Sequence, residues 1–219
     1  MKALVLALLL ASPAAASGDV VGAWRDLQDR CRAAVAGAER LDVEGLESRA
    51  PSFIARSVED PLFGERFVLD VLRTSARTVP TGIWGPPGGR FEMQLLEFVT
   101  RPGTRAICEV RPARGGPDLT ATEADAIWEA FDADRAEAVH GGGYVAADTR
   151  SGQDTRRAAI DLAGDNPRGC PVVVSLTVRP GYFRSSAAER AGVPGCGGPS
   201  LAEGGLTLPP SALNPRSAP

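Results

Sequence analysis

Apolar and polar positions alternate most clearly between residues 91 and 111, in two runs separated by Pro102-Gly103. Successive side chains of a strand point to opposite faces, so the second run would place small apolar residues on one face and charged residues on the other. Pro followed by Gly is the order that a type II turn favours. The pattern therefore predicts a β-hairpin at the centre of the fold. Its inward residues in the second strand would be Ala106, Cys108 and Val110.

The hairpin departs from strict alternation at two places. Ile107 is apolar among the charged residues of the outward face. In the first run the apolar phase shifts by one residue between Leu95 and Leu96, which is the change that a β-bulge produces. The sequence therefore predicts a bulge in the first strand and an exposed apolar side chain in the second. A short helix over residues 92–99 is the alternative, and the Pro-Gly turn disfavours it.

Apolar residues at intervals of three and four predict two amphipathic helices. The first spans residues 19–38 and the second residues 120–139. The second opens with the capping-box pattern Thr120-Ala121-Thr122-Glu123. Each helix should bury one face. The predicted stripes are Val20, Trp24, Leu27, Cys31 and Ala34 in the first helix, and Ala124, Ile127, Trp128, Phe131 and Ala138 in the second.

The rest of the chain gives unequal signals. Residues 171–179 alternate cleanly and predict a strand, whereas residues 65–77 fit both a strand and a helix, with the strand favoured. Residues 82–89 have the composition of a rigid loop. Trp84 is expected to fill apolar space beneath this loop or, alternatively, to stack on a ligand. Residues 145–169 are predicted to be a polar loop, and no internal repeat is visible.

The order of these elements predicts an α+β fold: a small, mostly antiparallel sheet with two packed helices, forming a disulfide-stapled two-layer sandwich. Residues 17–196 would form this single domain. Residues 197–219 are rich in Gly, Pro and Ser and are expected to be largely disordered.

The first 16 residues have the three parts of a secretory signal peptide. Lys2 supplies the positive charge, residues 3–10 form an apolar run, and small residues precede a cleavage site after Ala16. The run is too short to span a bilayer, which takes about 20 apolar residues. The mature protein is therefore expected to be soluble and periplasmic or secreted, with no membrane span after cleavage.

Charge argues against a nucleic-acid partner. The chain has 24 Lys and Arg against 27 Asp and Glu, a net charge of -3. The lysine at position 2 leaves with the signal peptide, so the mature chain is slightly more acidic. Nucleic-acid binding usually requires a clustered basic face, which this composition does not indicate.

The four cysteines predict two disulfide bonds, because an even number in an exported chain is typical of an oxidising compartment. Cys31 faces inward from a helix and Cys108 faces inward from a strand, so packing the helix on the sheet would bring them within bridging range. This favours Cys31–Cys108 and leaves Cys170–Cys196. Four cysteines allow three pairings, and the sequence alone does not choose among them. The wide spacing and the absence of C-x-x-C argue against a zinc site and a thioredoxin-like site.

His140 is the one histidine, and His140-Gly141-Gly142-Gly143 resembles the HGGG oxyanion loop of lipases and esterases. The resemblance is confined to those residues, because G-x-S-x-G is absent and no second histidine can serve a catalytic triad. A helix end explains the motif better, since histidine suits the negative end of the helix dipole and glycines end the helix.

Carboxylates offer two weaker candidates. Asp132-Ala133-Asp134 resembles the start of a calcium loop, but the glycine and the distal Glu are missing, so a solvated helix face is the better interpretation. A glycosidase needs only two carboxylates across a cleft. Nothing in the pattern raises any carboxylate above a surface charge. Those expected on the exposed face of the sheet are Glu92, Glu97 and Glu109.

The sequence therefore predicts no catalytic residue, no metal and no cofactor. The first hypothesis is a non-catalytic exported binding module that contacts an envelope protein through the hairpin face around Ile107, where arginines could meet an anionic partner. The second is an envelope hydrolase that uses carboxylates on glycans or His140 on esters. The third is a carrier of a small apolar ligand between helix and sheet, which tryptophan fluorescence would report. The hairpin arginines are Arg101, Arg105, Arg111 and Arg114, and the tryptophans are Trp24, Trp84 and Trp128.

Overall fold

A computed structural model describes most of the predicted domain. The predicted signal peptide lies outside the described residues, as does the strand predicted over residues 65–77 except for Arg77. Most of the tail predicted to be disordered also lies outside them. The described residues are 17–49, 77–99, 104–147, 149–152, 155–190, 193, 195–198 and 201.

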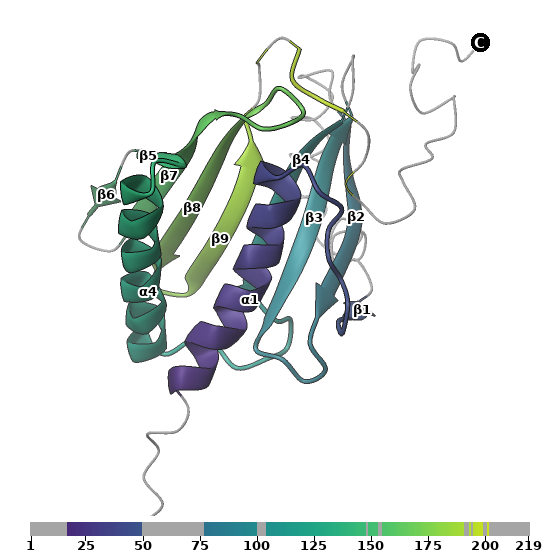
Figure 1. Ribbon diagram of the computed structural model, residues 1–219. Helices are drawn as coiled ribbons and strands as arrows, with labels where there is room; N and C mark the ends of the chain where they lie inside the picture. Colours follow the sequence, from purple (N-terminus) through teal and green to yellow (C-terminus); the bar gives the residue numbers. More distant parts are fainter. Residues whose placement is uncertain are drawn as a thin grey trace, which may run out of the picture.

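A nine-stranded sheet organises the described chain (Figure 1). The strands lie in the order β1-β2-β3-β4-β9-β8-β7-β5, with β6 also paired to β7, and each pairing is antiparallel. The bounds are β1 Glu47–Arg49, β2 Arg77–Gly85, β3 Phe91–Val99, β4 Thr104–Pro112, β5 Tyr144–Ala146, β6 Arg150–Ser151, β7 Arg156–Asp165, β8 Pro171–Arg179 and β9 Tyr182–Glu189.

Two helices, α1 (Ser17–Ala36) and α4 (Ala121–His140), lie on the same face of the sheet (Figure 1). Helix α1 contacts β3, β4, β8 and β9, and α4 contacts β5, β7 and β8. The fold is therefore α+β, as predicted, but its sheet is larger than the small one expected. Neither described helix is long and apolar enough to span a bilayer.

The capping box that the sequence predicts at the start of α4 is present. The Thr120 side chain accepts a hydrogen bond from the Glu123 amide, and the Glu123 carboxylate accepts one from the Thr120 amide at 2.8 Å. Arg90 also donates to Glu123 at 3.0 Å. The hydrogen bond from Arg90, followed by that from Thr120, lowers the pKa of the Glu123 carboxyl. Glu123 thus fixes both the start of α4 and the turn before β3.

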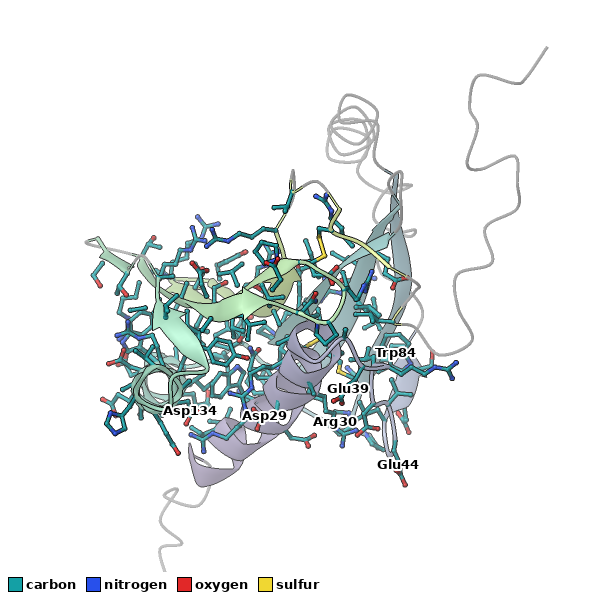
Figure 2. All side chains as sticks on the ribbon, turned by 45° about the horizontal axis from the view of Figure 1, so that its top comes forward. Asp29, Arg30, Glu39, Glu44, Trp84 and Asp134 are labelled. Carbon is teal, nitrogen blue, oxygen red and sulfur yellow. A yellow bond between two sulfur atoms is a disulfide. The ribbon has the colours of Figure 1, made fainter. Side chains whose placement is uncertain are left out.

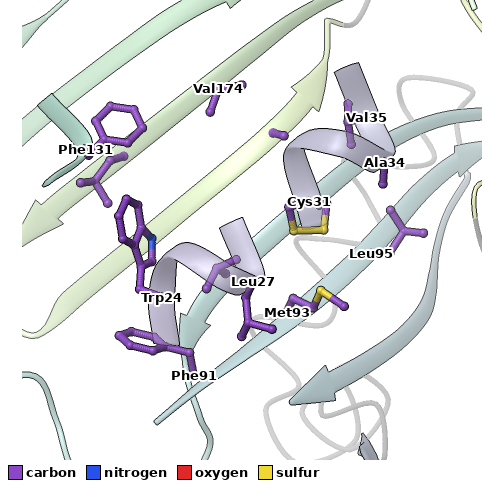
Figure 3. Close-up of a cluster of buried hydrophobic side chains, with 14 of the residues drawn as sticks. Trp24, Leu27, Cys31, Ala34, Val35, Phe91, Met93, Leu95, Phe131 and Val174 are labelled. Carbon is purple, nitrogen blue, oxygen red and sulfur yellow. A yellow bond between two sulfur atoms is a disulfide. The ribbon is translucent and has the colours of Figure 1, made fainter. Parts of the chain in front are cut away.

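The predicted stripe of α1 forms the centre of the core (Figure 3). Trp24 and Leu27 are buried against the inward side chains of β3, and the Trp24 ring meets Phe131 of α4 edge-on with ring centroids 6.4 Å apart. Burying each large apolar side chain stabilises the fold by roughly 1.5–3 kcal/mol. The β3 residues in this cluster are Phe91, Met93 and Leu95.

Two disulfides are present, with the pairing that the sequence pattern favours. Cys31–Cys108 joins α1 to β4, with Cα atoms 5.2 Å apart (Figure 3). Cys170–Cys196 joins the start of β8 to the segment after β9, with Cα atoms 4.6 Å apart. The first bridge thus ties α1 to the sheet, and the second ties the segment after β9 to the start of β8.

The predicted bulge in the first hairpin strand is wrong. β3 and β4 pair in one continuous register from Phe91 to Val99, and the irregularity lies in β2 between Pro80 and Gly82. The apolar phase seemed to shift because Glu97 occupies an inward position, where it is 0% exposed. Its carboxylate accepts a hydrogen bond from the Leu201 amide at 2.6 Å, which compensates for its burial.

Two predicted loops are also partly wrong. Residues 145–169 contain most of β5 and all of β6 and β7, and residues 82–85, expected in a rigid loop, continue β2. Trp84 is therefore a half-buried strand residue that packs on the core. β7 escaped prediction because its segment is rich in alanine and carries Asp and Gly, which are uncommon in strands.

Buried polar groups meet at the C-terminal end of α1. The Glu189 carboxylate, whose side chain is fully buried, accepts hydrogen bonds from the Ala106 amide at 2.7 Å and from Asn166 Nδ2 at 2.9 Å. The Arg168 guanidinium lies 3.4 Å from the same carboxylate. Asn166 Nδ2 also donates to the Val35 carbonyl at 2.8 Å. This network connects α1, β4, β9 and the turn before β8.

Leu201, which belongs to the tail predicted to be disordered, packs on the core near the same end of α1. Leu201 is 4% exposed and belongs to the apolar core. Its carbonyl accepts a hydrogen bond from the Leu41 amide at 3.0 Å, and its own amide donates to Glu97. Position 201, which composition places in the disordered tail, is thus part of the fold.

The sheet contains a repeat that the sequence did not reveal. Helix α1 precedes β2, β3 and β4 in the chain, and α4 precedes β7, β8 and β9. Because β4 pairs with β9, the two sets of three strands meet last strand to last strand, as an approximate twofold axis requires. The strand register agrees with this twofold relation. Each residue of the first set of strands lies the same number of positions before its equivalent in the second set. Such pairs are Arg77 with Arg156, Met93 with Val172, and Cys108 with Ala187.

Candidate functional site

The face of the sheet opposite the two helices, here called the outer face, carries a continuous row of apolar side chains. Leu96 pairs with Ile107, Ile107 with Ala188, and Ala188 with Val173, so the four lie side by side across β3, β4, β9 and β8. All four are partly exposed. We call these four residues the apolar row.

Charged pairs flank the apolar row. Arg184 of β9 forms an ion pair with Glu109 of β4, and Arg111 lies 2.9 Å from Glu92. Burial opposes the charge of Arg184, but the attraction of Glu109 and a hydrogen bond with Tyr182 outweigh it and raise the pKa of Arg184. The flanking groups are thus held in place as fixed charges.

Arginines outnumber carboxylates on the described part of the outer face, although the whole chain has a net charge of -3. Strand register places these side chains, because alternate residues of a strand share a face. The outward arginines are Arg49, Arg105, Arg111, Arg157, Arg179, Arg184 and Arg190, and the outward carboxylates are Glu47, Glu92, Glu109, Asp161 and Asp165.

His140 lies at the exposed end of α4, in its last turn. Gly141 caps the helix by donating to the Glu137 carbonyl at 2.8 Å, and Gly142 has a φ of 74°, which glycine adopts readily. The Gly143 carbonyl then accepts from Ala163 of β7. These contacts support a helix end that leads into β5, which is the interpretation that the sequence favours over an oxyanion loop.

The carboxylates considered for glycan chemistry are buried or held in ion pairs. Glu92 and Glu109 point to the outer face, where Glu92 is 2% exposed, and Glu97 points to the helix face and is 0% exposed. The exposed positions predicted for Glu92 and Glu97 are therefore wrong. Glu92 lies between the guanidinium groups of Arg49 at 3.3 Å and Arg111 at 2.9 Å. A carboxylate held this way is a structural ion-pair partner.

The acidic stretch of α4, where Figure 2 labels Asp134, forms ion pairs within α4 and with α1. Asp132 lies 2.6 Å from Arg135, three residues along the helix. Asp134 accepts two hydrogen bonds from the Arg25 guanidinium of α1, at 3.1 and 3.2 Å. Within the described ranges, no three His, Cys, Asp or Glu side chains gather as a metal site requires.

The three tryptophans have separate environments. Trp24 is 1% exposed in the core, and Trp84 and Trp128 are half-buried. The Arg156 guanidinium lies 5.1 Å from the Trp128 ring centroid, a cation–π contact between β7 and α4. These contacts assign the rings to packing.

No family model matches the sequence, and the comparisons with curated proteins and solved structures found no match. Function is therefore inferred from geometry. Sequence reasoning found Ile107, but it missed the other three residues of the apolar row. The signal that could have found them is the register of β4 with β9, which requires knowing that β9 is a strand.

Proposed function

We propose that this protein is a non-catalytic binding module that docks a partner protein on the outer face of its sheet. The observation that supports the proposal is the apolar row across four strands, flanked by ion pairs and arginines. Protein interfaces commonly combine an apolar centre with a polar rim. The partner would present apolar side chains bordered by carboxylates, which complement the excess of arginine.

The geometry gives the alternative functions less support. A glycan hydrolase needs two carboxylates across one cleft, whereas Glu97 is buried on the helix side of the sheet, and Glu92 and Glu109 are held in ion pairs with arginines. A carrier of an apolar ligand needs a cavity between helix and sheet. The space between α1, α4 and the sheet beside Trp24 is about 20 Å³, which is about the room that one water molecule needs.

We further propose that the protein works in the periplasm or outside the cell. Two disulfides support this compartment, because such bonds persist in oxidising surroundings and are rare in the cytosol. The predicted signal peptide over residues 1–16 supports it independently.

Intact mass spectrometry of the protein from its native host tests the compartment. We expect a mature chain that starts at Ser17 and is four hydrogens lighter than its reduced form, because both bridges are closed. An uncut chain with free thiols would show that the protein is cytosolic and remove this part of the proposal.

Replacing Ile107 by Asp tests the docking face. A charge in the middle of the apolar row should weaken partner capture at least tenfold, because losing a central interface contact costs about 1.4 kcal/mol or more. Capture is measured by cross-linking the tagged protein in its host envelope and quantifying bound proteins by mass spectrometry.

The matched control is Ala136→Asp, which introduces the same charge at an exposed position of α4, on the opposite side of the sheet from the apolar row. It should leave capture unchanged. Ile107→Thr retains a β-branched side chain and should weaken capture while preserving the melting temperature, which separates docking from folding. If both Ile107 variants capture partners as the wild type does, docking on the outer face is rejected.

A further inference from the structure

A block of six side chains covers part of the outer face where β7, β8 and β9 lie side by side (Figure 1). Strand register places five of them, because paired residues of antiparallel strands share a face. The sixth, Thr155, directly precedes β7 and lines an open hollow of about 480 Å³ together with Arg179 and Tyr182. We call this set the donor block, and its members are Thr155, Arg157, Thr177, Arg179, Tyr182 and Arg184.

Each member of the donor block carries an N–H or O–H group, and none carries a carboxylate. Thr177 lies at the centre, paired with Arg157 of β7 on one side and with Arg184 of β9 on the other. Arg179 is the diagonal neighbour of both arginines, at roughly 7–8 Å, a separation that long side chains can bridge. The three guanidinium groups can therefore reach one ligand that lies above Thr177.

The positive charge of the donor block is only partly balanced. Arg184 forms an ion pair with Glu109. Arg157 and Arg179 are both exposed, and no carboxylate in the described part of the chain forms an ion pair with either of them. Like charges close together on a sheet repel each other, and the chain as a whole has a net charge of -3. Two uncompensated arginines in an acidic protein therefore favour an anion at the donor block.

Contacts inside and beside the donor block hold two of its arginines in place. The Arg179 guanidinium lies 4.5 Å from the Tyr182 ring centroid, a cation–π contact that orders the side chain. Arg184 is held by Glu109 and by a hydrogen bond with Tyr182. Side chains that are already ordered lose less conformational entropy when a ligand binds, so the donor block is prepared for binding.

We propose that the donor block binds a phosphate or sulfate group. Such a tetrahedral oxyanion offers more oxygens than a carboxylate, so it can accept hydrogen bonds from several guanidinium groups and a hydroxyl at once. Arg157 and Arg179 would supply most of the attraction, and the Thr177 hydroxyl would donate from between the arginines. The donor block shares no residue with the apolar row, so this site does not depend on the proposed docking function.

NMR of the ¹⁵N-labelled, disulfide-intact protein tests the site directly. Sodium phosphate, sodium sulfate and glycerol 1-phosphate are titrated separately at neutral pH, with sodium chloride keeping the ionic strength constant. We expect saturable shifts of the backbone amide signals of residues 177–184. The ligand that saturates at the lowest concentration identifies the group and shows whether it is bound free or as an ester.

Matched variants show whether the donor block is responsible. Arg157→Gln and Arg179→Gln should each weaken binding severalfold, because each loses one charge-assisted contact, and should leave the melting temperature unchanged. Arg40→Gln is the control, since it removes the same charge at an exposed position between α1 and β1. It should bind as the wild type does.

Two results would overturn the proposal. One is a shift that grows linearly with all three anions, which reflects a general salt effect. The other is equal binding by Arg157→Gln, Arg179→Gln and Arg40→Gln. Ile107→Thr, the variant that probes docking, should leave oxyanion binding unchanged, so the docking proposal and this one can fail separately.

Discussion

Replacing both Cys31 and Cys108 by alanine should lower the free energy of unfolding by about 4.5 kcal/mol in the loop-entropy model. The bond closes a loop with a sequence separation of 77 residues, so its loss frees a large part of the unfolded chain. Both cysteines are 0% exposed, and their removal also weakens the contact between α1 and β4. Urea denaturation followed by tryptophan fluorescence measures the change.

The matched control is the double replacement of Cys170 and Cys196 by alanine. Its loop has a sequence separation of 26 residues, and the same model gives about 3.5 kcal/mol. The first double variant should therefore unfold at a lower urea concentration than the second. The reverse order would show that α1 is held on the sheet mainly by packing and that the Cys31–Cys108 bond adds little.

Replacing Glu189 by alanine should cost about 3–5 kcal/mol, because it removes one partner of a buried ion pair. The Glu189 side chain is fully buried beside Arg168 and accepts from the Ala106 amide and Asn166. Without it, two buried donors lose their acceptor and a buried guanidinium loses a counter-charge. The loss is measured by urea denaturation at neutral pH.

Asp132→Ala is the control for Glu189→Ala. Asp132 also pairs with an arginine, but its side chain is 50% exposed. Exposed pairs contribute about 1 kcal/mol or less, so this variant should unfold close to the wild type. If Glu189→Ala were equally mild, the polar network at the end of α1 would not stabilise the fold.

Periodicity predicted the elements whose buried and exposed residues differ strongly in character. The stripe from Val20 to Ala34 and the alternation from Pro171 to Arg179 are of this kind. β9 alternates as well, but its inward residues after Phe183 are Ser185, Ala187 and Glu189, so the pattern carries no apolar signal. Pairing between strands holds this segment in the sheet, and a single sequence does not display pairing.

The residues of the candidate site also divide into those that one strand reveals and those that depend on pairing between strands. Ile107 could be predicted because an apolar side chain among charged neighbours is visible along one strand. The rest of the apolar row depends on register between strands that are distant in sequence.

The approximate twofold relation between the two sets of strands has a consequence for the history of the chain. It is the arrangement that results when two copies of a shorter polypeptide, which share at least a helix followed by three paired strands in the described residues, become joined end to end. A single copy would expose the edge of its last strand, which favours pairing with another copy. Each half also keeps its own disulfide, Cys31–Cys108 or Cys170–Cys196. The seam between β4 and β9 would then be a former subunit interface, now enclosed within one molecule.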